Sequence, residues 1–196
     1  MPEDLDACVH FHGHLCPGLV YGFLVARAAI EQMALKRSED EEVVVIAEND
    51  SCAIDALQVL LGATAGKGNL ILKDYGKNAY TVLKRSTGQA LRFSRKKVYN
   101  YQGRELDAFR NLEAVVADGS ATEQQKWRHK RLKAEDLLAQ PAENVFTITA
   151  EEFKMPPYAP LARSEACSTC GEMTMATKLV ASPDGRRFCR PCAKNL

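Results

Sequence analysis

The segment Phe11–Gly18 carries two histidines and a cysteine within five residues, directly before a predicted helix. Imidazole and thiolate bind zinc and similar metals, so His12, His14 and Cys16 are candidate ligands. Pro17 suits the first turn of a helix, which places Cys16 at the N-cap. There the helix dipole and unpaired N–H groups are expected to lower the thiol pKa. The alternative is that the histidines pack against a helix end and the cysteine is a small buried hydrophobe.

A further candidate thiol, Cys52, also falls at a predicted helix start. If the two helix starts face each other, both thiols and one histidine provide three ligands and leave a fourth position open, the layout of catalytic zinc. Asp50 and Asp55 lie close to Cys52 and are candidates for orienting a ligand histidine or acting as a general base. Without a metal, Cys16 or Cys52 would instead be a reactive thiolate with a neighbouring histidine as its base.

The glycine-rich segment Gly62–Gly68 resembles a phosphate-binding loop but does not match its pattern. Three residues rather than four separate Gly62 from Gly66, and Gly68 stands where the loop needs a serine or threonine for magnesium. We therefore reject a nucleoside-triphosphatase function. Lys67 on this turn is a candidate anion-binding residue, and the alternative is a solvated turn lysine.

Four cysteines near the end of the sequence form two C-x2-C pairs separated by 18 residues, the spacing of a tetrathiolate zinc ribbon. Four thiolates close a tetrahedral site and leave no position for substrate, so this zinc is predicted to be structural. The segment has few large apolar residues, so the metal would supply its folding energy. The alternatives are an iron–sulfur cluster and a thioredoxin-like redox pair, which here lacks its βαβ setting. The four cysteines are Cys167, Cys170, Cys189 and Cys192.

The elements expected to position these residues follow from the spacing of apolar side chains. Asp4–His14 fits either a short helix or a strand with its histidines and cysteines on one face. Val43–Ile46 is β-branched and apolar throughout, which predicts a strand buried on both faces, and Asp50 or Ser51 would cap the helix that follows. Further helices are predicted at 19–33, 54–61, 106–116 and 121–139, and further strands at 70–73, 79–83, 89–93 and 145–149.

Composition is that of an ordinary globular protein, with 46% apolar residues, 26% charged residues and a net charge of +1. No segment approaches the roughly 20 apolar residues that span a bilayer. The acidic N-terminus lacks the regions of a signal peptide. We therefore expect a cytoplasmic protein without membrane association, whose clustered cysteines bind metal rather than form disulfides. Basic residues gather at 84–104, where seven occur without an acid, and in the predicted helix at 121–139.

These features predict an α+β fold: a mixed α/β core domain with helices packed on a small sheet, plus a C-terminal zinc ribbon. The core domain is expected at residues 1–153 and includes a helical segment at about 105–140. A proline-rich linker follows at 154–164, and the ribbon occupies 165–196.

Several motifs resemble, in the same order, those of the FmdE family, which is named after formylmethanofuran dehydrogenase. They are Phe11–Gly18, Asp50–Gln58, Gly66–Leu70 and Asp74–Lys77. The resemblance covers roughly residues 5–155, and many family members carry a C-terminal zinc ribbon. It implies an α+β core, an intertwined homodimer and a metal or active-site pocket. The residues that it places at this pocket are His12, His14, Cys16 and Cys52.

The family's name associates it with the molybdenum or tungsten enzyme that reduces carbon dioxide onto methanofuran, which implies a larger enzyme complex as a partner. This chain departs from the family at Ala63, where members usually have a cysteine. If that cysteine is a ligand, this site uses another group, a water molecule or no metal. The basic residues at 84–104 would suit a phosphate-bearing ligand such as a pterin dinucleotide, and an exposed hairpin face is the alternative.

We therefore expect a metal-binding accessory subunit or enzyme, associated with an oxidoreductase, in one-carbon or molybdopterin-linked metabolism. A second metal, expected to be zinc, would occupy the His/Cys site. One alternative is a non-catalytic dimeric module whose ribbon and basic patches bind a partner protein or nucleic acid, although the ribbon lacks interleaved aromatics. The other is a thiol-based redox or metal-delivery protein. The catalytic candidates are Cys16, Cys52, His14, Asp50, Asp55 and Lys67.

Overall fold

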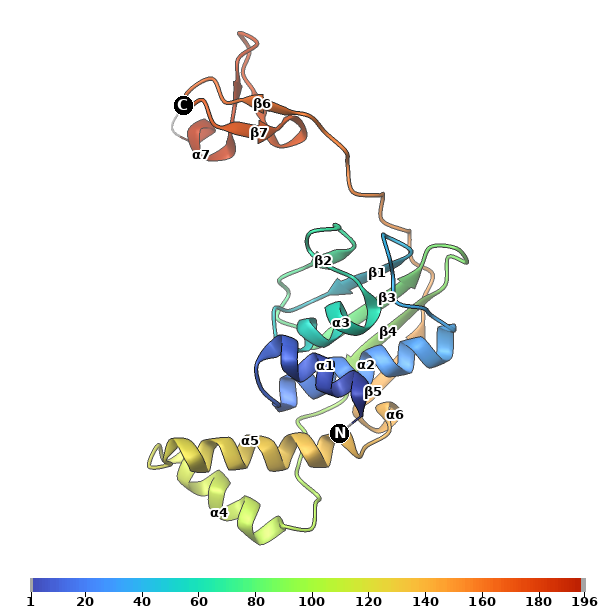
Figure 1. Cartoon of the computed structure of the whole chain (residues 1–196), viewed down its shortest axis with the longest axis vertical. Coiled ribbons are helices and arrows are strands. Elements are labelled where there is room, and N and C mark those ends of the chain that lie inside the picture. Colours follow the sequence, from blue (N-terminus) through green and yellow to red (C-terminus); the bar gives the residue numbers. More distant parts are fainter. Residues whose placement is uncertain (1, 195–196) are drawn as a thin grey trace. The chain divides into compact units, whose positions relative to one another are not determined.

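The main sheet is built around buried, β-branched strands. In the computed structural model, which describes residues 2–194, all five residues of β1 (Val43–Ala47) are buried, as its sequence predicts. β1 pairs in parallel with β2 (Leu70–Leu72) and antiparallel with β3 (Ala79–Lys84). β4 (Ala90–Arg95) and β5 (Phe146–Ala150) extend the sheet antiparallel, which gives the order β2-β1-β3-β4-β5 (Figure 1).

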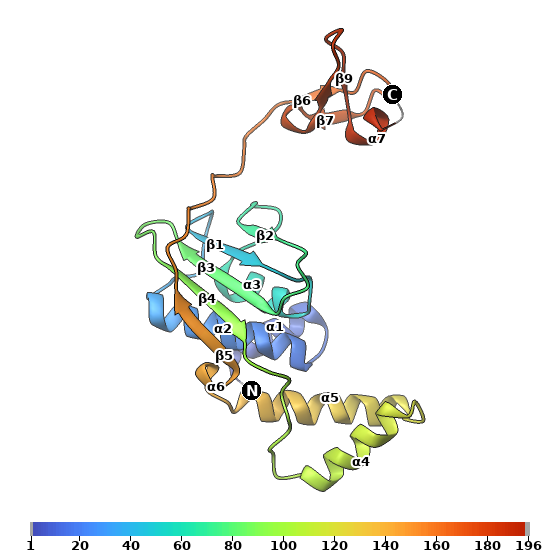
Figure 2. The same ribbon diagram turned by 180° about the vertical axis from the view of Figure 1, so that it is seen from behind.

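Three helices cover one face of this sheet: α1 (Glu3–His12), α2 (Pro17–Met33) and α3 (Ala53–Leu61) (Figures 1 and 2). Asp4–His14 thus takes the helical alternative rather than the strand. α2 packs along α3, and α1 contacts both of them. The helical layer therefore brings the end of α1 and the starts of α2 and α3 to one side of the core.

Two glycines of α2 allow α3 to approach closely. A Cβ atom on Gly22 would lie 2.0 Å from the carbonyl oxygen of Ala53, at the first residue of α3. One turn earlier, a Cβ on Gly18 would lie 2.9 Å from the Cβ of Cys52. Contacts that short are not tolerated, so glycine is required at both positions for the start of α3 to lie directly against α2.

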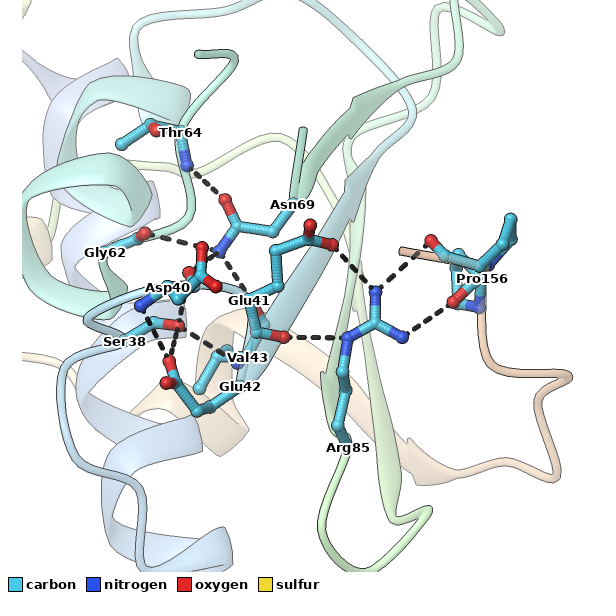
Figure 3. A network of polar contacts seen from close by, with 11 residues as sticks. Ser38, Asp40, Glu41, Glu42, Val43, Gly62, Thr64, Asn69, Arg85 and Pro156 are labelled. Atoms are coloured by element: carbon cyan, nitrogen blue, oxygen red, sulfur yellow. Dashed lines mark hydrogen bonds and ion pairs between the residues drawn. The ribbon is translucent and has the colours of Figure 1, made fainter. Parts of the chain in front are cut away.

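The opposite face of the sheet is covered by the chain that follows β5. Phe153 and Met155 pack on a buried cluster of sheet residues, Val44, Ile46, Leu83 and Ala90. The guanidinium of Arg85 donates to the backbone oxygens of Glu41 (2.8 Å) and Pro156 (2.7 Å) and pairs with the buried Glu41 carboxylate (Figure 3). The first residues of the predicted linker are therefore packed on the core.

A helical hairpin is inserted between β4 and β5, and it consists of α4 (Leu106–Ala117) and α5 (Glu123–Leu138). Thr122 and Gln125 form a capping box that begins α5. α4 and α5 share a small cluster of Phe109, Leu112 and Leu132, and α5 also packs on α2. The hairpin was predicted from its periodicity, whereas the short α6 (Ala142–Val145) was not.

The chain divides into two compact units, of which the first ends at Pro157 and the second begins at Tyr158. The second unit contains two hairpins, β6 (Ser164–Ala166) with β7 (Met173–Met175) and β8 (Val180–Ala181) with β9 (Arg187–Phe188). A single 3-10 turn and a short final helix complete it, η1 (Ala176–Lys178) and α7 (Arg190–Ala193). The predicted α+β fold with an added C-terminal ribbon is confirmed. None of the helices formed by residues 2–194 combines the length and apolar character that a bilayer span requires.

Replacement of Gly22 by alanine is expected to destabilise the core unit, because the new methyl group collides with the backbone of Ala53. Overpacking of this kind costs about 1–3 kcal/mol, which urea denaturation would detect. Gly66→Ala is the matched control, because a Cβ at Gly66 meets no atom within 4 Å. Equal stability of the two variants would show that α2 and α3 do not depend on this contact.

Candidate metal centre

The turn between α1 and α2 brings His12 and Cys16 together. Gly13 ends α1 in a left-handed conformation with φ of 93°, and the chain reverses direction within four residues. Cys16 is the N-cap of α2, as predicted, and its sulfur accepts a hydrogen bond from the backbone N–H of Leu19 at 3.4 Å. His12, the last residue of α1, places its Nε2 atom 3.7 Å from the Cys16 sulfur.

The first turn of α3 completes the cluster. Cys52 is the N-cap residue of α3, and Asp55 lies three residues later on the same side of the helix. One ligand atom each from His12, Cys16 and Cys52 lies within 4.8 Å of the other two. Neither Asp50 nor Ser51 caps α3, contrary to the prediction: Cys52 takes the cap position, and the Ser51 N–H and hydroxyl both donate to Asn49.

Asp55 fixes the orientation of His12. Its Oδ2 atom lies 2.7 Å from His12 Nδ1, and the His12 side chain is only 12% exposed. A hydrogen on Nδ1 that is donated to this carboxylate leaves the lone pair of Nε2 directed toward the Cys16 sulfur. Carboxylates hold metal-binding histidines in this manner in many proteins.

The Cys16 thiol does not have the lowered pKa that its N-cap position predicts. Burial raises the pKa, and the nearby Cys52 thiol raises it further. The N–H groups of Leu19 and Gly18 oppose this effect but are outweighed. The sequence-based expectation was wrong because it counted the helix start but not the burial of the sulfur among α1, α2 and α3.

The remaining predicted site residues lie outside this cluster. The ring of His14 stacks on the His12 ring at 4.6 Å, and its other neighbour is Trp127 of α5, in an edge contact at 5.0 Å. Asp50 is exposed in the loop before α3. The Lys67 ammonium donates to the backbone oxygens of Ser38 (3.0 Å) and Glu39 (3.2 Å), so its contacts belong to a loop of the core.

The same loop explains the Gly-Lys-Gly-Asn turn. Asn69 is fully buried, and its amide nitrogen donates to the backbone oxygens of Val43, Asp40 and Gly62 (Figure 3). Its side-chain oxygen accepts from the Thr64 N–H at 2.8 Å. This turn therefore joins β1 to the end of α3 and does not cradle a phosphate group.

Ala63, the departure from the family pattern, does not remove a ligand from the cluster within this chain. It is fully buried just beyond the C-terminal end of α3, whereas Cys52 stands at the start of that helix. A helix of this length separates the two positions by about 15 Å. A cysteine at position 63 would therefore not reach the metal ligands of its own chain.

Most of the basic residues at 84–104 serve the core. The Lys84 ammonium donates to the backbone oxygen of Met33, and the Arg95 guanidinium lies 5.0 Å from the Tyr21 ring centre. Arg92 forms an ion pair with Glu48, and Arg85 is bound as described above. Lys96 donates to a backbone oxygen of α6. These contacts favour a structural role over the phosphate-binding interpretation.

Three contributors to the site do not stand out in the sequence. Gly18 and Gly22 read there only as part of a motif and as a weak helix former, although their spacing of four residues marks one helix face. Trp127 is far from the cluster in sequence and reaches it only through the packing of α5. Small residues at helical spacing were the one available signal, and it identified a close contact but not its partner.

The second unit brings the four predicted cysteines together, with one sulfur from each within 4.8 Å of the others. The sulfurs of Cys170 and Cys189 are 3.9 Å apart, and the Cys189 N–H donates to the Cys167 sulfur. Backbone N–H groups, led by that of Cys170, lower the pKa of Cys167 to about 6. A thiolate at this position is ready to bind zinc.

Comparison with known families agrees with both sites. Residues 11–152 match the family model described as FmdE, molybdenum formylmethanofuran dehydrogenase operon. The chain belongs to the FmdE family. Residues 160–194 match the prokaryotic dksA/traR C4-type zinc finger, so the FmdE unit of this chain is followed by a zinc-finger domain whose four cysteines fit zinc binding.

Two similar proteins extend this assignment. A probable S-adenosyl-L-methionine-binding protein of Archaeoglobus fulgidus is 30% identical over 193 residues, which are 93% of this chain and 50% of that protein. The chain thus spans about half the length of this curated relative. A crystal structure of an FmdE-like protein of tungsten formylmethanofuran dehydrogenase, from Syntrophus aciditrophicus, superposes with a TM-score of 0.57 at 20% identity. It covers 97% of this chain and 90% of that one, which shows a shared fold.

Replacement of Cys170 or Cys189 by serine is expected to abolish zinc binding in the second unit and to unfold it, because the metal supplies its folding energy. The core unit has its own hydrophobic clusters and should keep its melting temperature. Zinc content by elemental mass spectrometry and thermal unfolding by circular dichroism would measure both effects. Full zinc occupancy in either variant would refute the four-cysteine assignment.

Proposed function

We propose that the core unit binds a zinc ion through His12 Nε2 and the sulfurs of Cys16 and Cys52, and that this ion is its functional centre. The observation that carries the proposal is the bond between Asp55 and His12 Nδ1, at 2.7 Å, which turns Nε2 toward the thiols. A histidine that only packed against a helix end would not need this orientation. The proposed function is a metal-dependent enzyme or enzyme subunit that acts on a small oxygen-containing substrate.

The chemistry and spacing of the donors support zinc. Zinc binds thiolate sulfur at about 2.3 Å and imidazole nitrogen at about 2.0 Å, so two such ligands of a tetrahedral ion lie about 3.6 Å apart. The distance of 3.7 Å between His12 Nε2 and the Cys16 sulfur agrees with this value. One nitrogen and two sulfurs form a soft donor set, which suits zinc better than magnesium or calcium.

Three protein ligands leave a fourth position for an exchangeable ligand. When bound, zinc at such a site polarises a carbonyl group or lowers the pKa of a water molecule. Cys52 is exposed, so this side of the cluster is open to solvent. In this arrangement Asp55 orients His12, the two thiols hold the ion, and His14 is a candidate for proton transfer beside it.

Membership of the FmdE family supports a role in one-carbon metabolism. We propose that the protein acts in the cytoplasm as an accessory subunit or enzyme associated with an oxidoreductase, and that it forms a homodimer. The name of the Archaeoglobus fulgidus relative refers to a protein twice as long, so S-adenosylmethionine is a ligand to test rather than an assignment. A thiol-based redox protein and a non-catalytic binding module are the competing functions.

Metal content distinguishes these functions. We expect two zinc ions per chain in the natively purified protein and one in the Cys16→Ser, Cys52→Ser double variant, because only the four-cysteine site is then intact. Cys8→Ala is the matched control, since Cys8 is a buried cysteine outside the cluster. One zinc ion in all three proteins would contradict the proposal and favour a thiol centre without metal.

Replacement of Asp55 by asparagine tests the orientation of His12. The variant keeps an oxygen acceptor but loses the negative charge beside the ring, so the affinity for zinc in the core unit should fall about 10–100-fold. Competition with a chromogenic chelator would measure this change. Asp50→Asn, at an exposed carboxylate outside the cluster, should leave the affinity unchanged. Equal loss in both variants would show that general electrostatics, not orientation, is responsible.

A further inference from the structure

We propose that a cleft beside the candidate metal centre binds a small organic anion that carries a flat ring. One side of the cleft is the loop that follows α1, with His14 and Leu15. The other side is α5 of the helical hairpin. Because the His14 ring stacks on that of His12, the cleft adjoins the proposed zinc ligands.

The α5 side of the cleft is a single helical stripe. Its residues recur at intervals of three or four, so they share one face of the helix. The volume is about 870 Å³, within the range of sites that hold small molecules. The stripe consists of Gln124, Trp127, Arg128, Arg131, Glu135 and Leu138. It combines an aromatic ring with charged groups at the mouth of the site.

Trp127 supplies a surface for a flat ring. It is 48% exposed, and its ring contacts His14 in an edge arrangement at 5.0 Å. The ammonium of Lys130 lies 5.5 Å from the centre of the same ring. Lysine side chains are flexible, so a ligand ring can take the place of Lys130 on the indole while the ammonium remains close to its charge.

The charges that line the cleft favour an anion. Arg128 pairs with Glu105 at 3.0 Å and Arg131 with Glu135 at 2.7 Å, and all four side chains are substantially exposed. Exposed pairs of this kind are weak, so they yield readily to a ligand. A guanidinium has five N–H donors, and each of these pairs is made through one nitrogen. Together with Lys130, three cations stand against the single carboxylate that lines the cleft.

A second copy of the chain is a poorer occupant for the same reason. A two-fold symmetric contact brings the same surface of both copies together. The cationic stripe of one α5 would then face that of the other, and like charges repel across an interface. A small anion neutralises these charges instead.

Binding of 2-naphthoate tests the proposal. Calorimetry should show that 2-naphthoate binds about ten-fold more tightly than the uncharged 2-naphthamide, because only the former is attracted to the guanidinium groups. The cationic 2-naphthylmethylammonium should bind most weakly. The chain has one tryptophan, so its single indole N–H signal in a ¹⁵N spectrum belongs to Trp127 and should shift on binding.

Matched variants separate the cleft from general charge effects. The Arg128→Gln, Arg131→Gln double variant should weaken 2-naphthoate binding about ten-fold and leave 2-naphthamide unchanged. Arg110→Gln with Arg163→Gln removes two exposed charges outside the cleft and should change neither. Equal binding of the charged and uncharged probes, or equal loss in both double variants, would overturn the proposal.

Two further results complete the test. The Cys16→Ser, Cys52→Ser variant should still bind 2-naphthoate, because the cleft is formed without the metal, so failure of the zinc proposal would not remove this signal. Analytical ultracentrifugation of Trp127→Leu should show the same oligomeric state as the unaltered protein. A change of oligomeric state would make the cleft an interface between copies and would overturn the proposal.

Discussion

The close approach of α2 and α3 is the contact on which the candidate metal centre depends. Gly22 allows the backbone of α2 to lie directly against Ala53, and Gly18 makes room for Cys52 one turn earlier. This contact brings the start of α3 to the start of α2, where Cys16 is the N-cap. A larger side chain at either glycine would separate the helices and, with them, the two thiols.

With the helices fixed, each ligand is set by a different structural element. The end of α1 provides His12, the start of α2 provides Cys16, and the first turn of α3 provides both Cys52 and Asp55. The centre is therefore a meeting point of three helix ends rather than a site on one loop. Such an arrangement is rigid, because every ligand is held by an element packed in the core.

Local sequence features predicted much of the fold and part of the site. The run Val43–Ile46 indicated a buried strand, and Pro17 correctly placed Cys16 at a helix start. The contact between His12 and Asp55 joins residues 43 positions apart, so no local pattern could reveal it. Burial of the Cys16 sulfur and the binding of Lys67 to a core loop likewise arise from tertiary packing, which the sequence does not display.

The most direct test of the central claim is zinc-edge anomalous diffraction from crystals of the natively purified protein. We expect one peak among the four cysteines of the second unit and another bounded by His12 Nε2 and the sulfurs of Cys16 and Cys52. The second peak should lie about 2.3 Å from each sulfur and about 2.0 Å from the nitrogen, with one further non-protein ligand. A peak at the four cysteines alone, in crystals soaked with zinc, would contradict a zinc centre in the core unit.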